Sequence, residues 1–130
     1  MYNEISEAWR EWPRLTVPVT GQSCVGLGDT VLMAGGFSNW EITGRTVIFD
    51  TKTGSAREVA SLKYPRVNAE MVVYRGKPVI LGGSDGNGVR RSDGEMWNMD
   101  TETWEEADIH LNIGRQDFTL VTMAEEFECN

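Results

Sequence analysis

Apolar residues fall into short runs of four to seven residues, separated by glycine, proline and polar turn residues. None of these runs keeps a helical period, so the pattern predicts short strands. Tight turns at Gly28-Asp29 and at Arg75-Gly76-Lys77 join neighbouring runs into hairpins. The expected strands are 22–27, 31–36, 46–49, 56–59, 68–74, 79–83, 95–99 and 104–107.

The strand pattern repeats once along the chain. Two apolar runs end in a Gly-Gly pair, Gly35-Gly36 and Gly82-Gly83, and these pairs lie 47 residues apart. Further markers recur after 49 or 50 residues, namely Arg66 with Arg115 and Asp50 with Asp100. A fixed period of about 50 residues is typical of repeat architectures, in which each repeat is one supersecondary unit.

Two markers are missing from the earlier part of this series. Val19 lies one repeat before Arg66, so it replaces an expected arginine. A tryptophan occurs at Trp9 and Trp104, whereas Ala56 holds the place between them. The first repeat therefore departs from the pattern at one arginine and one tryptophan.

The ordered markers resemble the kelch repeat: an arginine, a strand, a second strand ending in Gly-Gly, an aromatic residue followed by Asp, and a tryptophan. The resemblance covers the chain from Trp9 to Met123. It implies an all-β fold of kelch-type β-propeller blades, each a four-stranded antiparallel sheet, with about two and a half blades and an incomplete ring.

Four segments follow from this resemblance. We expect an N-terminal segment at 1–18 with the last strand of a preceding blade, from Trp9 to Leu15. One blade is expected at 19–59 and a second at 66–107. The segment 115–130 is expected to hold the first strand of a further blade, from Asp117 to Met123, and an acidic tail.

The resemblance also implies structural roles for the motif residues. Gly-Gly pairs let inner strands approach closely, a tryptophan forms an apolar plate between blades, and a buried arginine bonds carbonyls or a carboxylate. The motif residues expected to act in this way are Trp9, Gly35, Gly36, Asp50, Arg66, Gly82, Gly83, Asp100, Trp104 and Arg115.

Partner contacts in kelch adaptors often come from residues just after Gly-Gly and from the start of the first strand. The matching places, with an aromatic of the first loop and an arginine pair of the second, give these candidates: Phe37, Asn39, Trp40, Asn68, Ser84, Asp85, Arg90, Arg91 and Asp117. Packing on its own blade is an equal alternative for Trp40, and a solvated pair is the alternative for Arg90 and Arg91.

Composition narrows the function. The chain carries a net charge of −8 and no basic stripe, which argues against nucleic acid and anionic membranes as partners. His110 is the only histidine, and Cys24 and Cys129 are the only cysteines, so we expect no metal, no cofactor and no disulfide framework. The start of the chain is acidic and shows no signal peptide, which favours a cytoplasmic location.

We therefore expect a non-enzymatic protein–protein interaction module that binds a protein or peptide, of the kind found in substrate adaptors and scaffold proteins. One alternative is part of a kelch-like propeller enzyme acting on sugars, similar to mutarotase or galactose oxidase. Another is a structural fragment that completes a propeller by oligomerisation, for example as a trimer. An adaptor predicts a BTB-type or F-box-type segment in the parent chain, whereas a sugar enzyme predicts a secretory segment.

Overall fold

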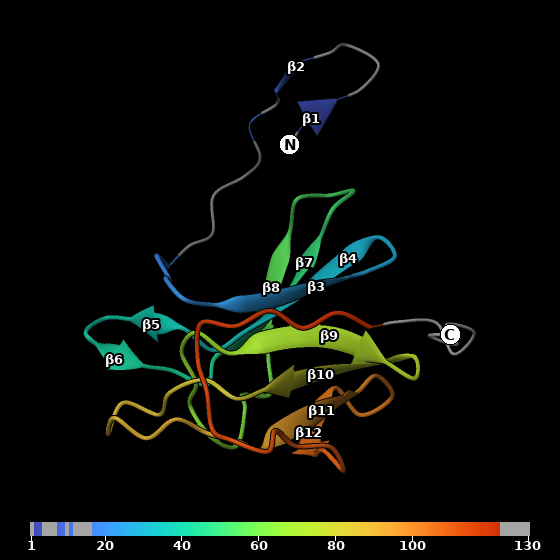
Figure 1. The fold of residues 1–130 in the computed structure, drawn as a ribbon. Coiled ribbons are helices and arrows are strands. Elements are labelled where there is room, and N and C mark those ends of the chain that lie inside the picture. Colours follow the sequence, from blue (N-terminus) through green and yellow to red (C-terminus); the bar gives the residue numbers. More distant parts are fainter. Residues whose placement is uncertain (1, 4–7, 10, 12–16, 123–130) are drawn as a thin grey trace.

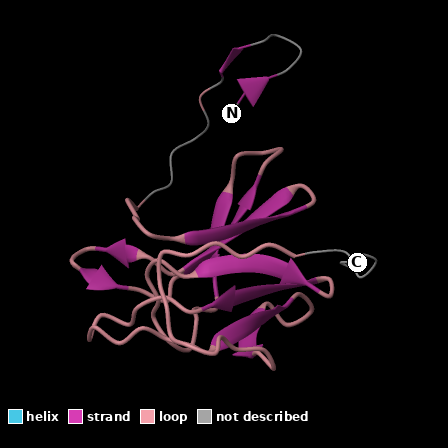
Figure 2. Ribbon diagram, viewed as in Figure 1, coloured by secondary structure: helices cyan, strands magenta, loops and turns pink. Residues whose placement is uncertain are grey.

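The described part of the chain is built entirely from strands and loops. The computed structural model describes residues 2–3, 8–9, 11 and 17–122, and no helix occurs among them (Figure 1, Figure 2). The strands are β1 (Tyr2–Asn3), β2 (Ala8–Trp9), β3 (Ser23–Leu27), β4 (Thr30–Ala34), β5 (Phe37–Ser38), β6 (Glu41–Ile42), β7 (Thr46–Asp50), β8 (Ala56–Val59), β9 (Glu70–Tyr74), β10 (Lys77–Leu81), β11 (Gly94–Asn98) and β12 (Thr103–Glu106).

Eight of these strands form two antiparallel four-stranded sheets. Blade 1 has the order β3-β4-β7-β8, and blade 2 has the order β9-β10-β11-β12. In each blade the strands follow one another in chain order, and β3 lies beside β9 (Figure 1). The expected all-β class and its four-stranded blades are confirmed.

Each second strand ends just before its Gly-Gly pair. Positive φ angles of 74° and 100° at Gly35 and Gly36, and of 69° and 85° at Gly82 and Gly83, take the chain out of the extended conformation. Glycine adopts such angles without a steric penalty, because it has no Cβ. The pairs therefore end β4 and β10 and begin the loops that follow them.

The two blades pack face to face around an apolar core. The buried residues of this core are Leu32, Ala34, Leu62, Met71, Ile80 and Trp97. Trp104 packs against the core, with its ring edge-on to Trp97 at a centroid distance of 5.1 Å. Its indole N–H donates a 3.0 Å hydrogen bond to the hydroxyl oxygen of Thr46 in blade 1. Trp104 thus joins blade 2 to blade 1.

The described part of the predicted N-terminal strand, Trp9 to Leu15, does not pair with a blade. Strand β2 covers only Ala8–Trp9, residue 11 is not in a strand, and β2 pairs with β1 through Tyr2 and Trp9 rather than with a blade. Trp9 is 82% exposed, so it is not a buried plate between blades. The rest of the predicted strand, including Leu15, lies outside the described residues.

The expected strand after residue 115 was also wrong within the described range, because residues 115–122 form no strand. The segment still occupies the position that the first strand of a further blade would have. The backbone N–H of Asp117 donates to the Asn68 carbonyl oxygen at 3.0 Å, and Gly83 N–H donates to the Arg115 carbonyl oxygen at 2.8 Å. No second strand pairs with it among the described residues. Residues 123–130, with the acidic tail and Cys129, lie outside the described part.

The turn between the third and fourth strands corrects one motif match. In blade 1 the carboxylate of Asp50 accepts hydrogen bonds from the backbone of Lys52 and Thr53 at 2.8 and 2.9 Å. In blade 2 the same bonds go to the side-chain oxygen of Asn98, at 3.0 and 3.1 Å. Asn98, and not the exposed Asp100, is therefore the equivalent of Asp50, since asparagine forms the same turn as aspartate.

Candidate functional site

The candidate contact residues of both repeats lie at one end of the blades. We call this the loop end, made of residues 17–21, 36–43, 66–68, 83–91 and 114–117. Backbone bridges join Thr20 with Phe37 and Val67 with Ser84, so each first strand begins beside the loop that follows Gly-Gly. In Figure 1 the loop end is on the left, with the β5–β6 hairpin and the loop after β10.

A chain of backbone hydrogen bonds links the starts of successive first strands. Asn68 N–H donates to the Gly21 carbonyl oxygen at 2.9 Å, and Asp117 N–H donates to the Asn68 carbonyl oxygen at 3.0 Å. All three residues have positive φ angles, of 64°, 54° and 54° in chain order. Gly, Asn and Asp are the residues that adopt this conformation most readily. The residue types at Asn68 and Asp117 are thus explained by backbone geometry.

Arg66 belongs to the loop end by its backbone, and its side chain holds blade 2 together. Its side chain is 0% exposed. The guanidinium donates to the Gly82 carbonyl at 3.0 Å, to the Asp93 carbonyl at 2.9 Å, and to the carboxylates of Asp93 and Glu95 at 3.2 Å each. Its own carbonyl accepts a 2.7 Å bond from Gly36 N–H in blade 1. This residue therefore ties the loop after Gly-Gly to the third strand and connects both blades.

Blade 1 lacks both the buried arginine and the carboxylate that corresponds to Glu95. Gly35 N–H bonds the Arg45 carbonyl just as Gly82 N–H bonds the Asp93 carbonyl, which makes Arg45 the equivalent of Asp93 and Val47 the equivalent of Glu95. The missing arginine at Val19 is therefore matched by a missing carboxylate at Val47. Both valines line the same hollow. A buried ion pair can be replaced by apolar residues when both members change together.

Arg115 does not reproduce the Arg66 network. Its side chain is exposed, and the hydrogen bond that it makes goes to the Ile113 carbonyl at 3.3 Å. Among the described residues no further blade supplies carbonyls and carboxylates to it. The expectation of a buried tie at Arg115 was therefore wrong for this structure.

The two arginines of the second loop, Arg90 and Arg91, have different surroundings. The guanidinium of Arg91 bonds the Asp93 carboxylate at 2.7 and 2.8 Å, lies 3.9 Å from Asp85, and stacks 4.1 Å from the ring centroid of Tyr64. Arg90 is exposed, and its backbone bridges Ser84. Arg91 is thus already engaged by carboxylates, which leaves Arg90 as the exposed cation of the pair.

The charges of this cluster favour ion pairs. Burial alone would raise the pKa of Asp93, but the hydrogen bond from Arg91 and the charge of Arg66 outweigh it and lower that pKa below its ordinary value of 3.8. The hydrogen bond to Asp93 raises the pKa of Arg91. Both groups are therefore held in their charged forms, which is the opposite of what a general acid at neutral pH requires.

The depressed pKa of Asp93 gives a pH-dependent prediction. Its stabilising contribution is present above the unfolded-state pKa and is lost as the pH falls below 3.8 through the folded-state pKa. We expect Asp93→Asn to lower the melting temperature at pH 7 and to flatten its decline as the pH falls below 3.8. Thermal unfolding at a series of pH values checks this, and parallel curves for both proteins would contradict it.

The loop after the first Gly-Gly pair forms a hairpin with a two-residue turn, which exposes the indole of Trp40. Strands β5 and β6 pair through Ser38 and Glu41, and the turn residues Asn39 and Trp40 have φ angles of 50° and 66°. Glycine is favoured at the second turn position, and a left-handed conformation costs an L-residue about 1–2 kcal/mol. Trp40 is also 94% exposed, so the alternative that it packs on its blade was wrong.

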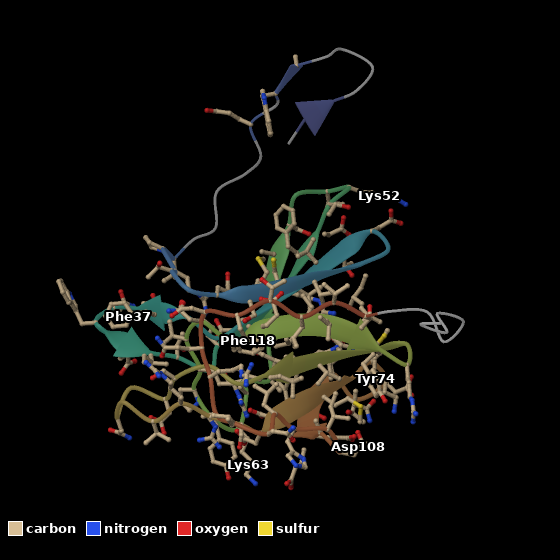
Figure 3. The ribbon with its side chains drawn as sticks, viewed as in Figure 1. Phe37, Lys52, Lys63, Tyr74, Asp108 and Phe118 are labelled. Carbon is tan, nitrogen blue, oxygen red and sulfur yellow. The ribbon has the colours of Figure 1, made fainter. Side chains whose placement is uncertain are left out.

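An open groove of about 350 Å³ lies beside this hairpin. Figure 3 shows Phe37, which is 36% exposed, at the hairpin end of the molecule. The groove is lined by Pro18, Val19, Thr20, Phe37, Ser38, Asn39 and Trp40. The sequence prediction missed the wall at 18–20, although Thr20 lies one repeat before Val67 and that spacing could have placed it at the loop end.

A second hollow, of about 190 Å³, lies on the open face of blade 1. Ala56 lines it and pairs with Phe49, as Trp104 pairs with Trp97 in blade 2. Ala56 thus holds the tryptophan place, and the missing indole leaves space there. Cys24 is exposed in blade 1, on the strand next to β4.

The described residues contain neither a candidate metal site nor a candidate membrane-spanning helix. No group of three or more His, Cys, Asp or Glu side chains there could hold a metal ion. Within the same residues no helix is long and apolar enough to cross a membrane. The loop end therefore presents surfaces and ion pairs rather than a ligand cage.

Comparison with known proteins agrees with this geometry. The family model described as the Kelch motif matches residues 65–108, which contain all of blade 2. A putative F-box/kelch-repeat protein of Arabidopsis thaliana is 29% identical over 86 residues, covering 66% of this chain and 24% of the relative. Kelch-like protein 41b of Danio rerio is 29% identical over 98 residues, covering 75% of this chain and 16% of the relative.

The fold is also similar to a solved structure, titled "Structure of YjhT". The two align with a TM-score of 0.65 at 20% sequence identity, over 81% of this chain and 32% of that chain. The chain spans about a quarter of the first curated relatives that it matches, at 24% and 25% of their lengths. Residues 65–108 are therefore a kelch motif, and the two sheets have the fold of blades of a kelch-type β-propeller.

Proposed function

We propose that the chain is a non-enzymatic protein-interaction module and that its loop end contacts the partner. The observation that carries this proposal is the exposed indole of Trp40, held in a left-handed turn at the tip of the β5–β6 hairpin. Strained backbone is retained where the surrounding structure enforces it, and it concentrates at functional positions. Large aromatic residues also supply much of the binding energy in protein interfaces.

The relatives support an adaptor role within a longer protein. Kelch adaptors are expected to carry a BTB-type or F-box-type segment beside their blades, and the names of the Arabidopsis relatives combine F-box with kelch repeat. In such a protein the loop end would bind a peptide segment of the partner, presented to a rigid pair of blades.

The sugar-enzyme alternative has weaker support at this end. Asp93 and Arg91 are held charged by each other, and Asp85 lies 3.9 Å from the Arg91 guanidinium. An acid or base that works near neutral pH needs a pKa shifted toward 7, whereas the pKa of Asp93 is lowered. These groups serve better as supports of the loop than as catalysts.

The sequence also left open that three copies of this chain close a ring. The packing between blades disfavours this alternative. The observed blade contact sets Trp104 against Thr46. In the repeat, Ala56 is the equivalent of Trp104, and Gly94 is the equivalent of Thr46. A neighbouring copy would therefore place its Ala56 against Gly94. A side chain at Gly94 would overlap Leu81 and the Ile80 carbonyl. Two small residues would then face each other across the hollow of blade 1. We propose instead that other blades cover this face.

A peptide selection tests the proposed function. A random peptide library displayed on phage is selected on the full chain and re-tested on two double variants. Trp40→Gly with Arg90→Ala changes the loop end, and Lys52→Ala with Met99→Ala changes the turns at the opposite end. We expect enriched peptides whose binding is lost only in the loop-end variant. Enrichment that depends on the opposite end, or no enrichment at all, would refute the proposal.

A further inference from the structure

The groove beside Trp40 is uncharged in a strongly acidic protein. None of its seven lining residues carries a charge, whereas the chain has a net charge of −8. We propose that this groove binds a short, uncharged, proline-rich segment of a partner protein in the polyproline II conformation. The inference rests on the proposed function and names the class of partner for the same site.

The hydrogen bonds of β5 exclude strand addition at β5. The backbone N–H and carbonyl of Phe37 both bond to Thr20, at 2.7 and 3.0 Å, and β6 pairs with the other side of β5. The Ser38 hydroxyl donates to the Pro18 carbonyl at 2.9 Å, which closes the wall of the groove. A peptide therefore finds no free strand edge of β5 and must be recognised through side chains.

Two further modes of peptide recognition fit the groove poorly. Acidic and phosphorylated segments are bound by clusters of arginine, and no arginine lines the groove. An amphipathic helix needs a groove long enough for contacts over two turns, whereas this one is bounded by a two-residue hairpin turn and residues 18–20. Among the modes that recognise an internal segment of a partner, the docking of a proline-rich segment on aromatic rings is the one that fits.

The side chains of the hairpin match what such a segment offers. Phe37 and Trp40 provide exposed aromatic faces on which proline rings can pack. A polyproline II segment has solvated carbonyl oxygens and few N–H groups, so its binding site must supply donors. The indole N–H of Trp40 and the amide of Asn39 make no hydrogen bond to the described residues, and both can donate. The segment is extended before it binds, which lowers the entropic cost of docking.

The test is a calorimetric titration of the full chain with three capped peptides of equal length. One is uncharged with the core Pro-Pro-Leu-Pro-Pro, one replaces every proline by glycine or serine, and one is rich in glutamate. We expect saturable binding of the proline-rich peptide alone. Trp40→Gly should weaken it roughly tenfold or more, because a central aromatic anchor is removed. Met99→Ala, an exposed apolar residue at the opposite end, should leave it unchanged.

The outcomes separate this inference from the proposed function. Glycine suits the φ angle of 66° at position 40, so Trp40→Gly is expected to fold, and its melting curve verifies that. Preference for the glutamate-rich or proline-free peptide, lost in Trp40→Gly, overturns the proline-rich class and leaves the interaction module standing. Absence of binding by all three peptides also overturns the inference, while the phage selection decides the module. Equal binding by wild type and Trp40→Gly overturns this groove as the site.

Discussion

Replacing Arg66 with alanine is expected to lower the free energy of unfolding by about 3–5 kcal/mol. The guanidinium is fully buried and bonds two carbonyls and two carboxylates. Its removal leaves Glu95, which is 3% exposed, as a buried charge without its cation. Urea unfolding of the wild type and the variant measures the difference.

Two matched variants test the reason for that loss. Lys52→Ala removes an exposed ion pair with Asp29, at 2.7 Å, and should cost less than about 1 kcal/mol. The double change Arg66→Val with Glu95→Val reproduces the valine pair of blade 1, Val19 and Val47, and should recover most of the loss. If the double variant is as unstable as Arg66→Ala, the unpaired carboxylate is not the cause.

Gly35→Ala is expected to destabilise the protein by about 3 kcal/mol. A Cβ at this position would overlap the backbone carbonyl oxygen of Arg66, the atom that accepts the hydrogen bond from Gly36. The φ angle of 74° adds the cost of a left-handed conformation. Neither the carbonyl nor the strand can move without separating the two blades.

Gly76→Ala is the control for this prediction. Gly76 has a φ angle of 75°, nearly the same as that of Gly35, but a Cβ there would meet nothing within 4 Å. Its substitution should cost only the conformational penalty of about 1 kcal/mol. Equal losses for both variants in thermal or urea unfolding would show that close approach of the blades is not what requires Gly35.

The blades could be predicted from the sequence because their signals are local. Apolar runs, turn residues and the two Gly-Gly pairs repeat at one period, and every predicted blade strand is observed within two residues at its start and end. The burial of Arg66 was implied by the family resemblance that these markers carry. The fourth strand of blade 1, β8, has the predicted bounds of 56–59.

The departures depend on contacts that no local pattern records. The turn residue Asn98 was missed because a match of aspartate to aspartate pointed two residues further, to Asp100. Arg91 could not be separated from Arg90 by sequence, since its partner Asp93 is identified only by the folded loop. The β5–β6 hairpin was expected as a loop, because its strands have two residues each. Arg115 and Trp9 match the motif in sequence, yet both are exposed in the structure.

The most direct measurement of the central claim is an NMR titration of the isotope-labelled full chain with a peptide enriched in the selection. The account predicts shifts of the Trp40 indole signal and of the backbone amides of Phe37 and Ser84 at the loop end. Signals of Lys52 and Met99, at the opposite end of the blades, should stay unchanged. Shifts centred on Lys52 and Met99, with Trp40 unaffected, would contradict the assignment of the loop end as the contact surface.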